Sequence, residues 1–255
     1  MPFSLKTVLL LTTSLTCTMA APVAENTTTY IPRNYGVLLY RAYDFQDVMG
    51  PLEILYGIST THQTNLFLLA ATLDPVLTEP RMPEMNPLNS SVFPRVLPTH
   101  TFADAPDLDV LIIPGGLGMR APDDLLEAEL KYIKDTYPKV KNIITVCTGS
   151  ALLARTGLLD GKRATTNKTS WKGVVQYGPL TKWVSPARWV VDGNIWTAAG
   201  VTAGFDIMFA FIKAHYPDGQ ALVDDWSKSI EYVPHEDASW DPFSAMNGIE
   251  PQNQL

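Results

Sequence analysis

Short apolar runs rich in β-branched residues alternate along this chain with longer segments whose apolar residues recur at helical spacing. The runs have the composition of strands buried in a parallel sheet and lie at 35–40, 65–71, 109–113 and 143–146. The segments at helical spacing predict helices and lie at 51–58, 123–134, 151–155, 205–214 and 220–229. Because strands and helices alternate without an interrupting linker, we expect one α/β domain. It should have three layers, with a mostly parallel sheet between helices.

Three segments depart from this alternation. Residues 74–100 are rich in Pro, Met and Asn, which predicts an irregular excursion with short strands at the sheet edge. Residues 188–191 and 195–198 flank an Asp-Gly turn, which predicts a β-hairpin. From Pro234 onward the chain is polar, and we expect a loop there. We therefore place the domain at 35–232, after an N-terminal linker at 21–34 and before a C-terminal tail at 233–255.

The first twenty residues have the order of a secretory signal peptide. Lys6 supplies a basic start, residues 8–15 a short apolar stretch, and Thr18-Met19-Ala20 a small-residue cleavage site. We expect cleavage after Ala20, with Ala21 as the alternative, and a protein that is secreted or lies in the lumen of the secretory pathway. Three glycosylation sequons, at Asn26, Asn89 and Asn167, are compatible with export. We expect the one at Asn167 to be unused, because it would lie close to the cleft.

Composition narrows the class of ligand. The chain has 255 residues, 46% of them hydrophobic, and a formal net charge of −7 without a basic cluster. That balance does not support a nucleic-acid surface and favours a small neutral or hydrophobic molecule. No His/Cys/Asp cluster has metal-ligand spacing, and the glycine turn has neither a phosphate-binding lysine nor a GxGxxG pattern. We therefore expect no metal and no nucleotide cofactor. We also expect no stable membrane insertion, because the apolar stretch at 8–15 is too short to span a bilayer.

The segment 142–160 places a thiol between a strand and a helix. The strand at 143–146 runs directly into Cys147, and the helix that follows ends at Gly157, a residue suited to a left-handed C-cap. A turn of this kind, a nucleophile elbow, projects its central side chain out of the sheet. We expect the helix N-terminus to stabilise the Cys147 thiolate and lower its pKa. The simpler alternative is a buried, inert cysteine. Removal of Cys17 with the signal peptide would leave Cys147 as the only thiol, so no intrachain disulfide could form.

Other polar or flexible positions follow neighbouring strands, where ligands bind in such sheets. Asp47 comes after the first strand, Gly115-Gly116-Leu117 after the third, and Thr148 directly after Cys147. Asp47 could be catalytic or only a helix cap, and Thr148 could act in the site or only satisfy backbone groups. The glycines are needed for a tight turn. Their N–H groups, with that of Leu117, could also form an oxyanion hole.

The order of these motifs resembles the DJ-1/PfpI superfamily. The matching segments are DVMGPLE, VLIIPGGLG, ITVCTGSALLARTGLLDGKRATT and TAAGVTAGFDIMF. The resemblance covers about residues 35–232. The segment that begins with Asp47, together with the Cys147-Thr148 pair, is most similar to the isonitrile hydratase branch. The resemblance implies a flavodoxin-like fold, a homodimer, Cys147 as nucleophile and Asp47 as proton shuttle.

Two departures bear on the activity. Peptidases and amidotransferases of the superfamily have a histidine after the nucleophile, where this chain has Thr148, so we expect no peptidase triad. Regulators of the superfamily often have His-Trp where this chain has Asn167-Lys168. The leading hypothesis is hydration of an isonitrile to an N-substituted formamide. The alternatives are a glyoxalase-like, carbonyl-protective enzyme and a non-catalytic secreted protein that binds ligands or senses redox state through Cys147.

Overall fold

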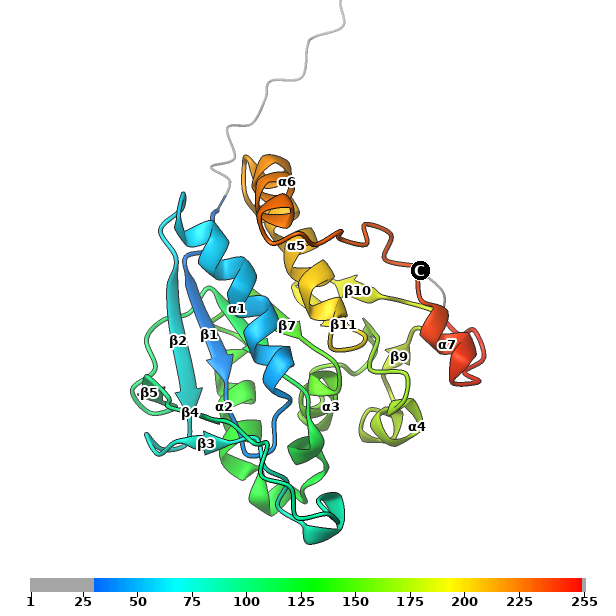
Figure 1. The fold of residues 1–255 in the computed structure, drawn as a ribbon. Coiled ribbons are helices and arrows are strands. Elements are labelled where there is room, and N and C mark those ends of the chain that lie inside the picture. The colour runs from blue at the N-terminus through cyan, green and yellow to red at the C-terminus, as the bar shows by residue number, and fades with distance from the viewer. Residues whose placement is uncertain (1–29, 254–255) are drawn as a thin grey trace, which may run out of the picture.

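The computed structural model describes residues 30–253 and is built on a seven-stranded sheet (Figure 1). The strand order is β10-β11-β7-β6-β1-β2-β5, and every neighbouring pair is parallel except β10 with β11. The strands are β1 (Asn34–Leu38), β2 (Asn65–Ala70), β5 (His100–Thr101), β6 (Val110–Ile113), β7 (Asn142–Thr145), β10 (Trp189–Asp192) and β11 (Ile195–Ala198). The predicted mostly parallel sheet is confirmed, and the predicted signal peptide lies outside the described residues.

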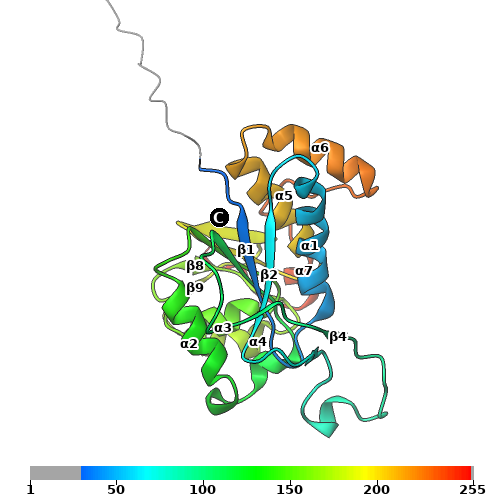
Figure 2. The same cartoon turned by 90° about the vertical axis from the view of Figure 1, so that its left-hand side faces the viewer.

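Helices cover both faces of this sheet (Figure 2). On one face lie α1 (Phe45–Ser59), α5 (Ala203–His215) and α6 (Gly219–Ser229), which contact one another. On the other lie α2 (Glu127–Thr136) and α3 (Gly149–Arg155). All four residues of β6 and of β7 are buried, as their continuous apolar runs predict for strands covered on both faces. This three-layer arrangement confirms the predicted flavodoxin-like class.

Several short elements lie outside the main sheet. Between β2 and β5 the chain forms a two-stranded ribbon of β3 (Val76–Leu77) and β4 (Arg95–Val96), and the intervening residues project from the body (Figure 2). The strands β8 (Arg163–Ala164) and β9 (Lys182–Trp183) form a second small sheet beside α4 (Trp171–Val174). The predicted excursion and the predicted hairpin of β10 and β11 are both confirmed. None of the helices in the described range is long and apolar enough to cross a bilayer.

Two local predictions need correction. The first helix was expected from Pro51, but α1 begins at Phe45, because the Asp44 side chain accepts the Gln46 N–H and caps it there. Asp47 therefore lies in the first turn and is not the cap.

The second correction concerns the tail, which was expected to be a loop. It contains α7 (Pro242–Met246), which begins with Pro242 in its first turn and with the Asp241 side chain accepting the Phe243 N–H. This Asp-Pro start is too short a signal to predict a helix without its tertiary contacts.

Candidate active site

The predicted site residues meet at the carboxyl ends of three adjacent strands. Ile113 of β6 pairs with Thr145 of β7, so Gly115 and Cys147, each two residues further on, leave the sheet side by side. On the other side of β6 lies β1, which leads through residues 39–44 into α1 and Asp47. In this strand order the chain reverses direction across the sheet between β1 and β6, which is where ligands bind in doubly wound folds.

The predicted elbow at Cys147 is present, and its backbone is strained. Cys147 has a φ of 57°, in the left-handed region that non-glycine residues rarely occupy, and α3 begins two residues later. A Cβ atom at Gly149 would lie 2.2 Å from the Ile113 carbonyl, so only glycine lets the helix start so close to β6. The predicted left-handed C-cap at Gly157 is also present, with a φ of 79°.

Asp47 is a buried carboxyl group beside the thiol. Its side chain has no exposed surface; Oδ2 accepts the Gly115 N–H at 2.9 Å, whereas Oδ1 has no hydrogen-bond partner of ordinary geometry among the described residues. Burial, and secondarily the charge of Asp44, raise the pKa of Asp47 to about 8, while the Gly115 N–H and the Cys147 thiol act in the opposite direction. Asp47 can therefore hold or release a proton near neutral pH, as general acid–base chemistry requires.

The thiol itself differs from the prediction. Cys147 is only 7% exposed, and burial together with the nearby Asp47 carboxylate raises the pKa of the Cys147 thiol well above its ordinary value. The Thr148 N–H at the helix start does favour the thiolate, but it does not outweigh the loss of water around the sulfur. The expectation of a lowered pKa was therefore wrong, because it counted the helix start and could not count the burial.

We expect the pKa of Asp47 to make the stability of the protein depend on pH. The folded-state pKa of about 8 exceeds the ordinary value of 3.8, so folding favours the protonated form. The contribution is present in full below the ordinary pKa and is lost as the pH rises through about 8, by at most about 1.4 kcal/mol per pH unit. In urea unfolding, the wild type should lose stability relative to Asp47→Asn between pH 5 and pH 8. The same difference at both pH values would contradict this assignment.

The glycine turn is shaped by the groups around it. A Cβ atom at Gly115 would lie 2.5 Å from the Thr148 backbone nitrogen and 2.9 Å from Asp47 Oδ2, so this position must be bare for those groups to converge. Gly116 has a φ of 130°, and a Cβ atom there would lie 2.5 Å from the Ala42 carbonyl. Close approach therefore requires glycine at both positions, and the positive φ is a second reason for glycine at Gly116 alone.

The predicted oxyanion hole is largely occupied by the protein itself. The Gly115 N–H donates to Asp47, and the Gly116 N–H donates to Thr148 Oγ1 at 2.9 Å. Of the three predicted donors, Leu117 alone has an N–H without an acceptor in the described part of the chain, and its side chain is partly exposed. The sequence cannot show which backbone donors are already used, because that depends on how the turn folds back onto its neighbours.

Thr148 has a clear structural role. Its hydroxyl accepts the Gly116 N–H and lies 3.4 Å from the Gly116 carbonyl, so it joins the elbow to the glycine turn. This contact favours the alternative in which Thr148 satisfies backbone groups. Through it, Thr148 also fixes the distance between the turn and Cys147.

Two residues that were not predicted as site residues also stabilise the site. Thr166, fully buried, donates to the Cys147 carbonyl at 3.1 Å. Arg155, in the last turn of α3, donates to the carbonyls of Met119 and Ala121 at 2.6 and 2.8 Å and so clamps the segment after the glycine turn. Both lie within the matching segment ITVCTGSALLARTGLLDGKRATT, but their partners lie on other elements. The described residues contain no group of three metal-ligating side chains.

Comparison with known proteins agrees with this geometry. A model of the DJ-1/PfpI family matches residues 47–214, which include Asp47 in the first turn of α1, the glycine turn and the elbow. The chain belongs to the DJ-1/PfpI family. Among its relatives is an isonitrile hydratase of Pseudomonas putida, 32% identical over 201 residues, which cover 78% of each chain. A deglycase of Thermococcus kodakarensis is 32% identical over 93 residues, or 36% of this chain and 52% of that protein.

Solved structures of DJ-1/PfpI proteins have the same fold. A ThiJ/PfpI family protein from Pseudomonas syringae superimposes with a TM-score of 0.65 at 28% identity, covering 85% of this chain and 83% of that one. The fold and the family resemblance expected from the sequence are therefore confirmed.

Proposed function

We propose that this DJ-1/PfpI protein is a cofactor-free hydratase of small electrophiles, most similar in activity to an isonitrile hydratase. The proposal rests on the buried Asp47 carboxyl group, which lies beside a thiol on a strained elbow. One oxygen of this carboxyl group has no hydrogen-bond partner of ordinary geometry among the described residues. Such a carboxyl group can exchange protons with the sulfur, the substrate and water. The relative from Pseudomonas putida, which matches over most of both chains, supports the isonitrile as substrate.

The reaction needs one proton shared between Cys147 and Asp47. The sulfur attacks the terminal carbon of R–N≡C while Asp47 transfers the proton to the same carbon, which gives a thioimidate, R–N=CH–S–Cys147. Asp47, now a carboxylate, activates a water molecule whose hydroxide adds to the carbon while the nitrogen takes up the remaining proton. Return of the hydroxyl proton to Asp47 breaks the C–S bond, releases R–NH–CHO and restores the starting pair.

Peptidase chemistry finds no support in the site. The four histidines of the chain, all within the described residues, are engaged elsewhere: His62 with Asp218, His100 with Thr99, His215 with the Phe211 carbonyl, and His235 stacked on Trp240. Without an imidazole beside Cys147, no Cys-His pair can activate the thiol or protonate a leaving amine.

A carbonyl-protective activity is the second candidate, and the partial match to a deglycase favours it. The same thiol could add to an aldehyde carbon, with Asp47 donating to the oxygen. A redox-sensing role has less support, because sensor cysteines are exposed and have lowered pKa values, whereas Cys147 is buried and its pKa is raised.

Substrate turnover distinguishes these functions. Purified protein should be assayed with alkyl and aryl isonitriles and with 2-oxoaldehydes, following formamide formation and 2-hydroxy acid formation separately. We expect multiple turnovers on at least one isonitrile. Turnover of 2-oxoaldehydes alone would replace the proposal by the second candidate, and stoichiometric modification of Cys147 without turnover would favour a sensor. Export through the N-terminal signal and assembly as a homodimer remain proposals from the sequence.

A further inference from the structure

A small cavity of about 190 Å³ lies at the carboxyl end of β11. One wall is the loop of residues 199–202 that connects β11 to α5, and a second wall is Asn167 with Lys168. The outer wall comes from the C-terminal tail, through Phe243 of α7 and Asn247 just after it. The tail thus contributes to a cavity at the strand ends of the sheet, although it lies beyond residues 47–214, which match the family.

Two segments of the cavity wall lie next to Cys147, which is not itself a lining residue. Thr197 of β11 pairs in parallel with Thr145 of β7, so Ala199 leaves the sheet beside Cys147 in the same direction. Thr166 donates to the Cys147 carbonyl, and Asn167, the next residue, lines the cavity. The cavity therefore lies on the β11 side of Cys147, separated from it by residues of these two segments.

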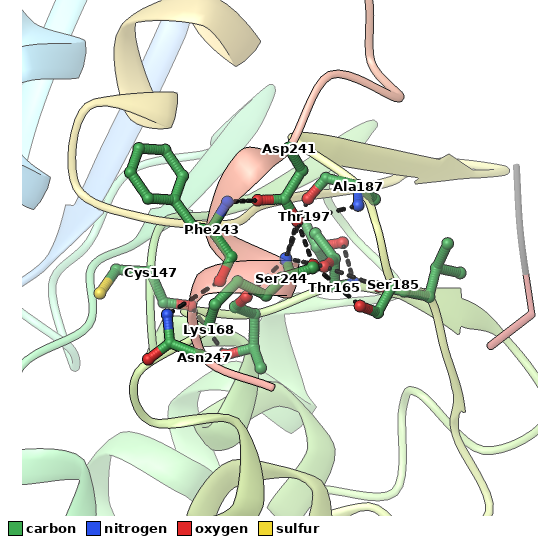
Figure 3. Close-up of polar contacts among 12 residues, drawn as sticks. Cys147, Thr165, Lys168, Ser185, Ala187, Thr197, Asp241, Phe243, Ser244 and Asn247 are labelled. Carbon is green, nitrogen blue, oxygen red and sulfur yellow. Dashed lines mark hydrogen bonds and ion pairs between the residues drawn. The ribbon is translucent and has the colours of Figure 1, made fainter. Parts of the chain in front are cut away.

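The tail is fixed to this place by a buried ion pair (Figure 3). Lys168 Nζ lies 3.1 Å from Asp241 Oδ2, and the two side chains are 2% and 0% exposed. The Asp241 carboxylate also accepts from the backbone N–H groups of Ala187 and Phe243, both at 3.1 Å, and from Ser244 Oγ at 2.6 Å. With its partners satisfied in this way, the ion pair sets the position of Phe243 rather than leaving it on a free tail.

The chemistry of the walls indicates what the cavity can receive. Its two cations are neutralised within the protein, Lys168 by Asp241 and Arg188 by a hydrogen bond of 2.8 Å to Asp206. The rest of the lining is uncharged and combines the Phe243 ring, Val201 and the bare backbone at Gly200 with the neutral polar side chains of Asn167, Thr169, Thr202 and Asn247. An apolar cavity of about 150 Å³ is enough for a benzene ring. The cavity therefore suits one neutral ring or a compact branched alkyl group.

We infer that this cavity is the specificity pocket for the organic group R of the electrophile, and that Phe243 of the C-terminal tail is its specificity-determining outer wall. The inference rests on the proposed function in that Cys147 is taken as the nucleophile. The preferred substrates have a neutral aryl or compact branched alkyl group, because a charged group would find no free partner in the pocket.

Alkylation of Cys147 tests the pocket without any assumption about turnover. Iodoacetamide and N-phenyliodoacetamide have the same reactive carbon and differ by one ring. The rate of each is followed by mass spectrometry of the peptide that contains Cys147, so that Cys17 does not contribute. The ratio of the N-phenyl rate to the iodoacetamide rate cancels any change in the pKa of the thiol.

Three variants separate the pocket from general effects of mutation. A Cβ atom at Gly200 would meet only Asn167 Nδ2, at 3.7 Å, so Gly200→Val can fill the cavity without a backbone clash. We expect it to lower the ratio by at least about fivefold, because the ring then has to displace packed atoms. Phe243→Ala should lower it by about two- to tenfold through loss of ring contact. Met246→Ala, on the same helix at a 75% exposed position outside the cavity, should leave it unchanged.

Each result decides a part of the inference. An unchanged ratio in Gly200→Val would show that the ring does not enter this cavity and would overturn the pocket. A lowered ratio in Gly200→Val with an unchanged ratio in Phe243→Ala would overturn the role of the tail. Failure of both reagents to modify Cys147 in the folded wild type would also contradict the inference, since the cavity would then have no passage to the sulfur. If the pocket is confirmed while isonitriles are not turned over, the proposed function alone fails.

Discussion

Replacement of Cys147 by alanine is expected to reduce turnover to the uncatalysed background. The proposed intermediate is a thioimidate on this sulfur, and Cys147 is the only cysteine in the described part of the chain. Cys147→Ser should be equally inactive, because a serine hydroxyl needs a base and no histidine is available beside it. Initial rates on the best isonitrile substrate would measure both losses. Residual turnover of Cys147→Ala at more than a few per cent of wild type would exclude covalent catalysis by this residue.

Stability provides the control for this result. Alanine at position 147 has to adopt the same left-handed backbone as cysteine, so Cys147→Ala should fold normally. Glycine adopts that conformation without strain, so Cys147→Gly should have a free energy of unfolding roughly 1 kcal/mol above that of Cys147→Ala while remaining inactive. A glycine variant that is more stable than the alanine variant but equally inactive would show that the strained backbone at the elbow is not needed for folding.

Replacement of Asp47 by asparagine is expected to lower kcat by about two to four powers of ten, with little change in KM. The amide has the shape of the carboxyl group and can still accept the Gly115 N–H through its oxygen. It cannot carry a proton between the sulfur, the substrate carbon and water. The loss should therefore lie in the transition state, and steady-state kinetics on the same substrate would show it.

Asp44→Asn is the matched control for Asp47→Asn. Asp44 caps α1 three residues earlier, and asparagine caps helices about as well as aspartate. It removes a charge that raises the pKa of Asp47 but leaves the proton carrier in place. We expect its kcat to stay within about a factor of ten of wild type. A kcat close to wild type in Asp47→Asn would refute the assigned mechanism and leave Asp47 with a structural role only.

The positions of the candidate catalytic residues could be predicted because their signals are local. The run of β-branched residues before Cys147 and the helical spacing after it place the thiol on an abrupt turn whatever surrounds it. The ends of parallel strands meet at one edge of the sheet, so Asp47 and Gly115 could be placed near Cys147 without knowing the distances.

Other properties of the same residues depend on packing, and the predictions that ignored it were wrong. The helix start favours the Cys147 thiolate, but burial dominates and raises the pKa of the thiol. Gly115 and Gly116 were expected to offer their N–H groups to substrate, yet Asp47 and Thr148 accept them within the protein. Solvation and hydrogen-bond partners are contributed by segments distant in sequence, so spacing along the chain does not report them.

The sequence by itself determined the alternating α/β fold, the elbow at Cys147 and the approach of Asp47 to it, because hydrophobic periodicity and turn residues act over a few positions. Only the tertiary structure decided the protonation of the pair and the wall of the cavity beside it. Lys168 and Asp241 are 73 residues apart by their numbers, and each is by itself an ordinary charged residue. Their burial against each other makes the polar tail a part of the site, because an ion pair removed from water has to be matched by fixed partners.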